Sequence, residues 1–157
     1  MGKYFSFILV VGVLSCFSCG DELLPGDGDY LVFGQFGAYC GGETCVEFYR
    51  LESDRIFEET SDNYTGGGFH PFNQFVELPE TAVNIAKELE TLFPTRLLVE
   101  PDTILGETNV IDAGYLYVEW KSETQHRYWI ISNSSVNLLP EYKTFATEIS
   151  KVINELN

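Results

Sequence analysis

Apolar residues recur with two different periods along the chain. In the regions 30–60 and 115–132, apolar and polar positions alternate over short runs bounded by Gly and polar residues, which is typical of β-strands. In 79–93 and 140–156, the apolar residues instead recur every three or four positions, and a Pro followed by Glu opens each stretch, which is typical of amphipathic helices. The pattern therefore predicts two groups of strands, each followed by one helix.

The N-terminus carries a third pattern. After Lys3, residues 4–14 are apolar apart from Ser6. This run is too short to span a bilayer, which takes about 20 apolar residues. It does have the length of a signal-peptide core, roughly 7 to 15 residues. We therefore expect a signal peptide that is cleaved from the mature protein.

Two cysteines follow the apolar run. Residues 13–16, Val-Leu-Ser-Cys, resemble the lipobox of bacterial lipoproteins, in which a small residue precedes the cysteine that receives diacylglycerol. The alternative is Cys19, which follows a Ser and precedes Gly-Asp-Glu, much like the acylated cysteine of surface-exported Bacteroidota-type lipoproteins. We expect lipidation at Cys16, with Cys19 as the second candidate.

These patterns divide the chain into three segments. They are a lipoprotein signal peptide in 1–18, cleaved before one of the two cysteines, a flexible acidic tether in 19–29, and a single domain in 30–157. A lipid anchor places the protein in the cell envelope, and we expect the outer membrane, facing either the periplasm or the cell surface. The lipid bilayer is then its first partner, through N-terminal acyl chains.

The first two strand-like runs are separated by residues 41–44, which include two Gly. If these residues form a four-residue hairpin loop, Cys40 lies directly opposite Cys45, at a Cα separation that suits a disulfide. The same register places Gly37 opposite Phe48, so that an aromatic ring packs over a glycine. Because export leads to an oxidising compartment, we expect a structural disulfide between Cys40 and Cys45.

A third strand in 55–60 completes a meander, and 74–78 offer one further strand. Between them, residues 61–73 contain three consecutive Gly and a Pro, which predicts a long loop. We therefore expect an α+β domain in which an antiparallel sheet packs against two helices, in the order strand-strand-strand-helix-strand-strand-helix. One hairpin of this sheet is closed by the predicted disulfide.

The two strands between the helices form a second predicted hairpin. A four-residue loop at 122–125 places Val118 opposite Trp129, on a face that we expect to join the core. The opposite face carries Tyr115, Tyr117, Glu119, His126 and Tyr128. Tyrosine-rich faces suit recognition, so this face and the loop at 66–72 are the predicted partner surfaces. The alternative is that a helix or loop covers the face and the tyrosines are half-buried structural residues.

Acidic residues dominate the charge. The chain has 24 Asp and Glu, and loss of Lys3 with the signal leaves eight Lys and Arg, a formal charge of −16. Nucleic acid and anionic lipid surfaces should repel such a domain, so we expect no nucleic-acid partner. A basic protein is the partner that this charge favours; the alternative is that acidity only keeps an exported protein soluble. The sequence does not indicate an oligomeric state.

The sequence lacks a nucleophile elbow, a phosphate-binding loop and a dinucleotide fingerprint. His70 and His126 have no metal-type spacing to each other or to the cysteines, so we expect no metal and no cofactor. Residues 102–104, Asp-Thr-Ile, resemble the acceptor sequence of the general O-glycosylation system in Bacteroidota. Thr103 is therefore a candidate glycosylation site.

Several features resemble small Bacteroidota-type lipoproteins of uncharacterised function. They are the lipobox-like signal, a Phe-Gly strand, a Gly- and Cys-rich loop ending at Cys45 and followed by Glu47-Phe48-Tyr49, a Leu-Pro-Glu helix start, a Tyr-Val-Glu strand and a C-terminal amphipathic helix. The resemblance covers most of the mature chain and implies an exported, lipid-anchored protein. It carries no activity over to any residue.

We therefore expect an envelope lipoprotein that acts as a binding or interaction module rather than as an enzyme. A more specific alternative is an inhibitor or immunity-like protein that neutralises a basic enzyme, which charge and small size favour. A hydrolase with paired carboxylates is the competing class, because such sites assemble from residues distant in sequence.

Overall fold

The computed structural model describes residues 28–37, 45–61, 64, 66–70, 74–107, 114–134 and 136–157. Its strands are β1 (Tyr30–Phe36), β2 (Glu47–Leu51), β3 (Ile56–Glu59), β4 (Phe75–Glu77), β5 (Ile104–Leu105), β6 (Tyr115–Lys121) and β7 (His126–Ser132). Its helices are α1 (Glu80–Ala86), α2 (Glu88–Leu92), the short 3-10 helix η2 (Thr95–Val99) and α3 (Pro140–Leu156). The predicted signal peptide, both candidate lipidation cysteines and nearly all of the tether lie outside the described residues.

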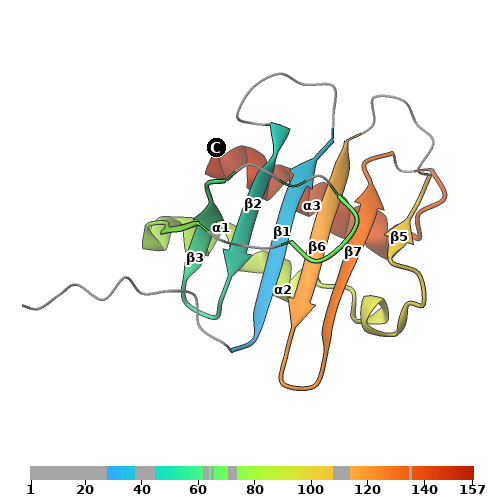
Figure 1. Ribbon diagram of the computed structural model, residues 1–157, viewed down its shortest axis with the longest axis horizontal. Coiled ribbons are helices and arrows are strands. Elements are labelled where there is room, and N and C mark those ends of the chain that lie inside the picture. Colours follow the sequence, from blue (N-terminus) through green and yellow to red (C-terminus); the bar gives the residue numbers. More distant parts are fainter. Residues whose placement is uncertain are drawn as a thin grey trace, which may run out of the picture.

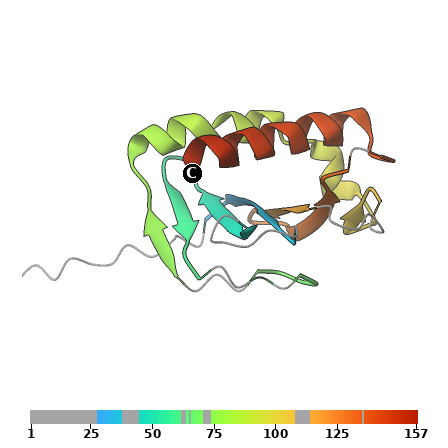
Figure 2. The same cartoon turned by 90° about the horizontal axis from the view of Figure 1, so that it is seen from above.

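The strands form one seven-stranded sheet in the order β4-β3-β2-β1-β6-β7-β5. All neighbouring strands are antiparallel except β5 and β7, which run parallel. Helices α1, α2 and α3 all cover the same face of the sheet (Figures 1 and 2). The predicted α+β class is thus confirmed, but the sheet is larger than expected and includes a parallel pair.

The helices begin where the Leu-Pro-Glu motifs predicted. Helix α1 follows Pro79, α3 begins with Pro140, and an acidic residue occupies the first turn of each, where it interacts favourably with the helix dipole. The first predicted helix is divided at Lys87 into α1 and α2. Within the described residues, no helix is long and apolar enough to cross a membrane.

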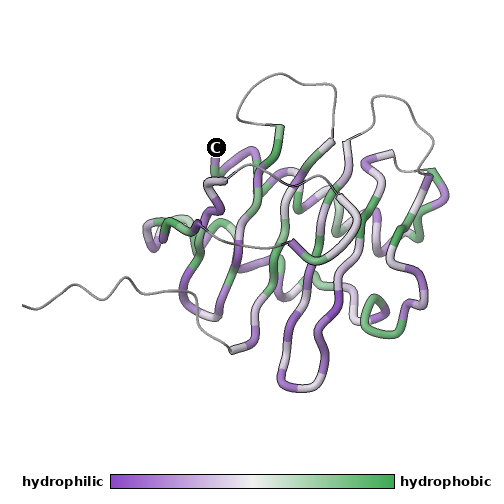
Figure 3. Tube along the Cα trace, viewed as in Figure 1, coloured by the Kyte–Doolittle hydropathy of each residue, from purple (hydrophilic) through white to green (hydrophobic). Residues whose placement is uncertain are grey.

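The main core lies between the sheet and the three helices. Leu31 and Phe33 of β1, Trp129 of β7 and Phe145 and Ile149 of α3 are all fully buried there. Removing each such side chain from water stabilises the fold by about 1.5–3 kcal/mol. The strands are correspondingly apolar along their centres, whereas the β6–β7 turn is hydrophilic (Figure 3).

The β6–β7 hairpin has the predicted register. Val118 lies opposite Trp129, and the turn comprises four residues, 122–125. The turn is closed by a backbone hydrogen bond of 2.8 Å from Ser122 N–H to the carbonyl of Gln125. Alternation along both strands then sends Val118 and Trp129 to the helix-covered face and the tyrosines to the other.

The predicted register of the first hairpin is wrong by three residues. Phe48 lies opposite Gly34 rather than Gly37, and β1 ends at Phe36. At Gly37 the backbone takes a φ of 77°, in the left-handed region that glycine favours, which accounts for the end of the strand before Cys40. Cys45 is disulfide-bonded, but Cys40 lies outside the described residues, so their pairing stays a prediction.

Among the short elements, one was expected and two were not. The additional strand that we expected in 74–78 is present as β4. Strand β5, with two residues, and η2 lie in a region where the sequence predicted no regular structure. A two-residue strand has no detectable alternation, and it forms here because it can pair with the free edge of β7.

Candidate functional site

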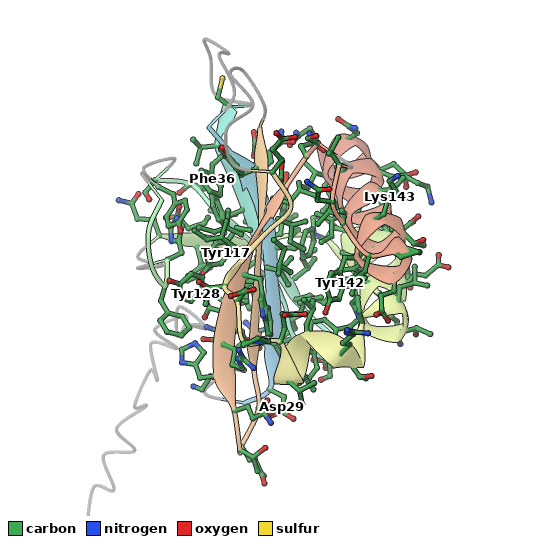
Figure 4. The ribbon with its side chains drawn as sticks, turned by 90° about the vertical axis from the view of Figure 1, so that its right-hand side faces the viewer. Asp29, Phe36, Tyr117, Tyr128, Tyr142 and Lys143 are labelled. Atoms are coloured by element: carbon green, nitrogen blue, oxygen red, sulfur yellow. The ribbon has the colours of Figure 1, made fainter. Side chains whose placement is uncertain are left out.

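The sheet face opposite the helices carries a second cluster of buried residues. Its members are Tyr30, Val32, Phe36, Phe48, Tyr64, Tyr117 and Ile130. Seen along the sheet, Phe36, Tyr117 and Tyr128 lie on this side, and Tyr142 and Lys143 lie on the helix side (Figure 4). This is the face that the sequence predicted as a partner surface.

Residues of the loop between β3 and β4 lie over this face. Tyr64 packs edge-on against Phe36, with 4.8 Å between ring centroids, and against Phe48 at 5.2 Å. The hydroxyl of Tyr64 donates a 2.9 Å hydrogen bond to the carbonyl of Gly68, which holds the Gly-rich part of the loop in shape. A loop therefore covers the centre of the tyrosine face, as the alternative interpretation of the sequence expected.

The residues of the predicted partner surface differ in exposure, and whether they bind a partner stays a prediction. Tyr117 is fully buried, because the loop and neighbouring rings cover it, and it cannot contact a partner directly. Tyr115 and Tyr128 are half-buried, and His126 is exposed. The accessible part of the face therefore lies along the edge of the covering loop.

A buried carboxylate organises the polar residues of this face. Glu119 is only 2% exposed. Its Oε1 accepts a 3.0 Å hydrogen bond from the hydroxyl of Tyr30 and lies 2.8 Å from Nε2 of His126, while its Oε2 accepts a hydrogen bond from Tyr117. Hydrogen-bonded partners thus engage both oxygens, which meets the requirement for a buried charge.

Tyr117 links this network to the loop. Its hydroxyl accepts a 3.0 Å hydrogen bond from the backbone N–H of His70 while it donates to Glu119. Burial and the negative charge of Glu119 both raise the pKa of Tyr117 well above its ordinary value, so the hydroxyl keeps the proton that it donates. The position of the loop is thereby coupled to a carboxylate on β6.

The side chain of His70 points into the same cluster. Its ring lies 4.5 Å from that of Phe48 and 5.1 Å from that of Tyr64, between centroids, and its Nε2 is 3.8 Å from Oε2 of the buried Glu59. Burial lowers the pKa of His70, although the charges of Glu59 and Glu119 oppose the shift. The neutral imidazole is therefore the favoured form, and His70 serves to anchor the loop.

Three contacting rings lie at the accessible edge of the site, the exposed Phe69 and His126 and the half-buried Tyr128, and we call them the aromatic rim. Phe69 is 46% exposed, and its ring lies 4.2 Å from that of His126 and 4.8 Å from that of Tyr128. Sequence analysis predicted the loop as a contact surface without singling out Phe69. Its contact with β7 bridges residues more than fifty positions apart, which no local pattern indicates.

Two cationic side chains contact Tyr30, the tyrosine that donates to Oε1 of Glu119. The guanidinium carbon of Arg50 lies 3.9 Å from the ring centroid of Tyr30, and Nζ of Lys121 lies 5.4 Å from it. Arg50 also forms a 3.0 Å ion pair with Glu52. These contacts hold Tyr30 in the orientation in which it donates to Glu119.

Among the described residues, no group of three or more His, Cys, Asp or Glu side chains could hold a metal ion. Thr103, the candidate glycosylation site, is exposed immediately before β5. Its backbone carbonyl accepts a 2.7 Å hydrogen bond from the N–H of Ile130. The candidate lipidation cysteines, Cys16 and Cys19, lie outside the described residues.

No protein-family model matches the chain, and no curated protein has a sequence that matches it.

Proposed function

We propose that the protein is an envelope lipoprotein, anchored through acyl chains at Cys16 or Cys19, whose domain binds a partner through the aromatic rim. The observation that carries the binding role is the exposed ring of Phe69, which packs on both His126 and Tyr128. Large exposed aromatic residues in an ordered arrangement are typical of recognition surfaces.

The rim is ordered before any partner arrives. Tyr128 belongs to a strand, and the ring of His126 is held by Glu119 at 2.8 Å. Phe69 belongs to a loop that Tyr117 ties to the sheet through the N–H of His70. Side chains that are already fixed lose little conformational entropy on binding, so their apolar area contributes more to affinity.

Charge favours a basic partner. The mature chain carries a formal charge of −16, and the rim presents ring faces to which a guanidinium or ammonium group binds favourably. The more specific form of this proposal is an inhibitor or immunity-like protein that neutralises a basic enzyme. Its binding should weaken steeply as salt is raised, because exposed charges are screened.

We also propose that the hairpin between β1 and β2 is closed by a disulfide between Cys40 and Cys45. The bonded state of Cys45 supports this pairing. Peptide mapping without reduction should recover one cross-linked peptide that contains both cysteines. A cross-link from Cys45 to any other cysteine would contradict the pairing.

The binding proposal can be tested by capture from envelope extracts of the natural host. A double variant, Phe69→Ser with Tyr128→Ser, should lose the partner that the wild-type protein captures, by about tenfold or more if two contact rings are removed. Val76→Ser is the matched control, because Val76 is an exposed apolar residue, 53% exposed, on the remote edge strand β4. Equal capture by the rim variant and the control would contradict the proposal.

The anchor needs its own test. Intact mass and membrane fractionation of the wild-type protein, of Cys16→Ala and of Cys19→Ala would show which cysteine, if either, carries the acyl chains. We expect the Cys16→Ala variant alone to lose both the acyl mass and the membrane association. If neither substitution changes them, lipid anchoring through these cysteines is wrong.

A further inference from the structure

A pocket of about 220 Å³ lies on the helix side of the sheet, far from the aromatic rim. Four of its lining residues, Lys143, Ala146, Thr147 and Ser150, share one face of α3, because their spacing of three and four residues matches the helical period. Leu138 and the end of β7, at Ser132 and Asn133, form the opposite wall. The pocket therefore has one apolar corner and several polar groups.

The hydroxyl groups of the pocket have different hydrogen-bonding roles. Thr147 donates to the carbonyl of Lys143 at 2.9 Å, and Ser150 donates to the carbonyl of Ala146 at 3.1 Å. Since each hydroxyl has one proton, these two oxygens can only accept from a ligand. Ser132 accepts from the N–H of Ser134 at 3.2 Å, and because it is 1% exposed it forms part of the pocket wall without contacting a ligand directly.

Lys143 adds a positive charge to this pocket. Among the described residues, Arg50, Arg55, Arg96 and Lys151 each form an ion pair with a Glu. Lys143, like Lys87, Lys121 and Arg127, has no carboxylate oxygen within 4.0 Å among the described residues, and it is the cation of these four that lines the pocket. An ammonium group that is not engaged by a carboxylate can bind an anion.

We propose that this pocket binds a small, polyhydroxylated anion of the size of a single sugar acid or sugar phosphate. The anionic group binds the ammonium group of Lys143, and the ligand's own hydroxyl groups donate to Thr147 and Ser150. The methyl and methylene groups of Ala146 and Leu138 contact the apolar face of the sugar ring. Neutral sugars lack the group that Lys143 binds, and simple anions such as acetate lack the donors for the two acceptor hydroxyls.

Titration calorimetry on the mature protein, purified in detergent from the membrane fraction, tests this proposal. The probes are glucuronate, glucose 6-phosphate, glucose and acetate. We expect one of the two anionic sugars to bind about tenfold or more tightly than glucose or acetate, because a charge-assisted hydrogen bond contributes about that factor. Which of the two binds more tightly distinguishes a carboxylate ligand from a phosphate ligand.

Two variants on the same helix decide whether the anionic sugar binds in this pocket. Lys143→Gln should weaken binding of the anionic sugar about tenfold, whereas Lys151→Gln, which removes a lysine paired with Glu148 at 2.7 Å outside the pocket, should not change it. Equal weakening by both substitutions would indicate a general effect of charge and would overturn the proposal. So would anionic sugars that bind no better than glucose.

Discussion

Nε2 of His126 lies 2.8 Å from Oε1 of Glu119, which joins an exposed imidazole to a carboxylate that is almost completely buried. This contact connects the surface of the aromatic rim to the polar network beneath it. The network in turn reaches the covering loop through Tyr117. The residues that we propose for binding and those that fix the loop therefore form one continuous structure.

The first prediction concerns Glu119. Glu119→Gln replaces one acceptor oxygen by an NH₂ donor, which then faces either the Tyr117 hydroxyl or the pair formed by Tyr30 and His126. We expect the free energy of unfolding in urea to fall by about 1–3 kcal/mol, because a buried donor is left without its acceptor. Glu123→Gln, at an exposed position in the β6–β7 turn, is the control and should have little effect. Equal stability of both variants would show that the network is not required.

The second prediction concerns Gly34, over which the ring of Phe48 packs. A Cβ atom at this position would lie 2.3 Å from the carbonyl oxygen of Glu47 and 2.7 Å from the Phe48 ring. Gly34→Ala should therefore lower the free energy of unfolding by about 1–3 kcal/mol or more, as overpacking does in a tight core. Gly28→Ala, with nothing within 4 Å, should leave the thermal midpoint unchanged. A Gly34→Ala variant as stable as wild type would contradict this packing.

The third prediction concerns pH. The pKa of His70 is lowered below its ordinary value of 6.5 because the ring is buried. As pH falls through 6.5, the unfolded chain takes up a proton that the folded chain resists, so stability that is fully present above this pH is progressively lost. The difference in unfolding free energy between pH 7.5 and pH 5.5 should be smaller in His70→Gln than in wild type. An identical difference in the two proteins would rule out this role of His70.

The fourth prediction concerns Tyr142 on α3, whose hydroxyl donates a 2.8 Å hydrogen bond to Glu100. Burial, this hydrogen bond and the charge of Glu100 raise the pKa of Tyr142 to about 12, from an ordinary value of 10.0. Its contribution to stability is therefore complete below pH 10 and is lost as pH rises towards 12. Ultraviolet titration of tyrosinate should show that Tyr142→Phe removes a late-titrating group. Glu100→Gln should move that group towards 10, and no movement would contradict the assignment.

The sequence predicted the parts of the fold that depend on local patterns. The pairing of Val118 with Trp129 follows from alternation in two strands of equal length joined by a short turn. The register of the first hairpin was wrong because it assumed a four-residue loop at 41–44, whereas β1 ends at Phe36 and β2 begins at Glu47. The positive φ of Gly37, which ends β1, has no counterpart in the apolar pattern.

The candidate site was predicted only in part, for a related reason. Alternation places Tyr115, Tyr117 and Tyr128 on one face, as the structure confirms. The burial of Tyr117 depends instead on rings that are distant in the chain, such as those of Phe48 and Tyr64, and on the loop whose His70 N–H donates to its hydroxyl. Contacts of this kind depend on how a long loop folds over a sheet, and the sequence of the loop carries no period that reveals it.

The most direct test of the binding role is site-specific photo-crosslinking in living cells of the natural host. A photoreactive phenylalanine analogue would replace Phe69 in one strain and Val76 in another, since both are exposed apolar positions but only the first belongs to the rim. We predict a discrete cross-linked partner from position 69, with a yield that decreases as salt is raised during crosslinking of isolated envelopes. Cross-links from position 76 alone, or the same products from both positions, would contradict recognition through the aromatic rim.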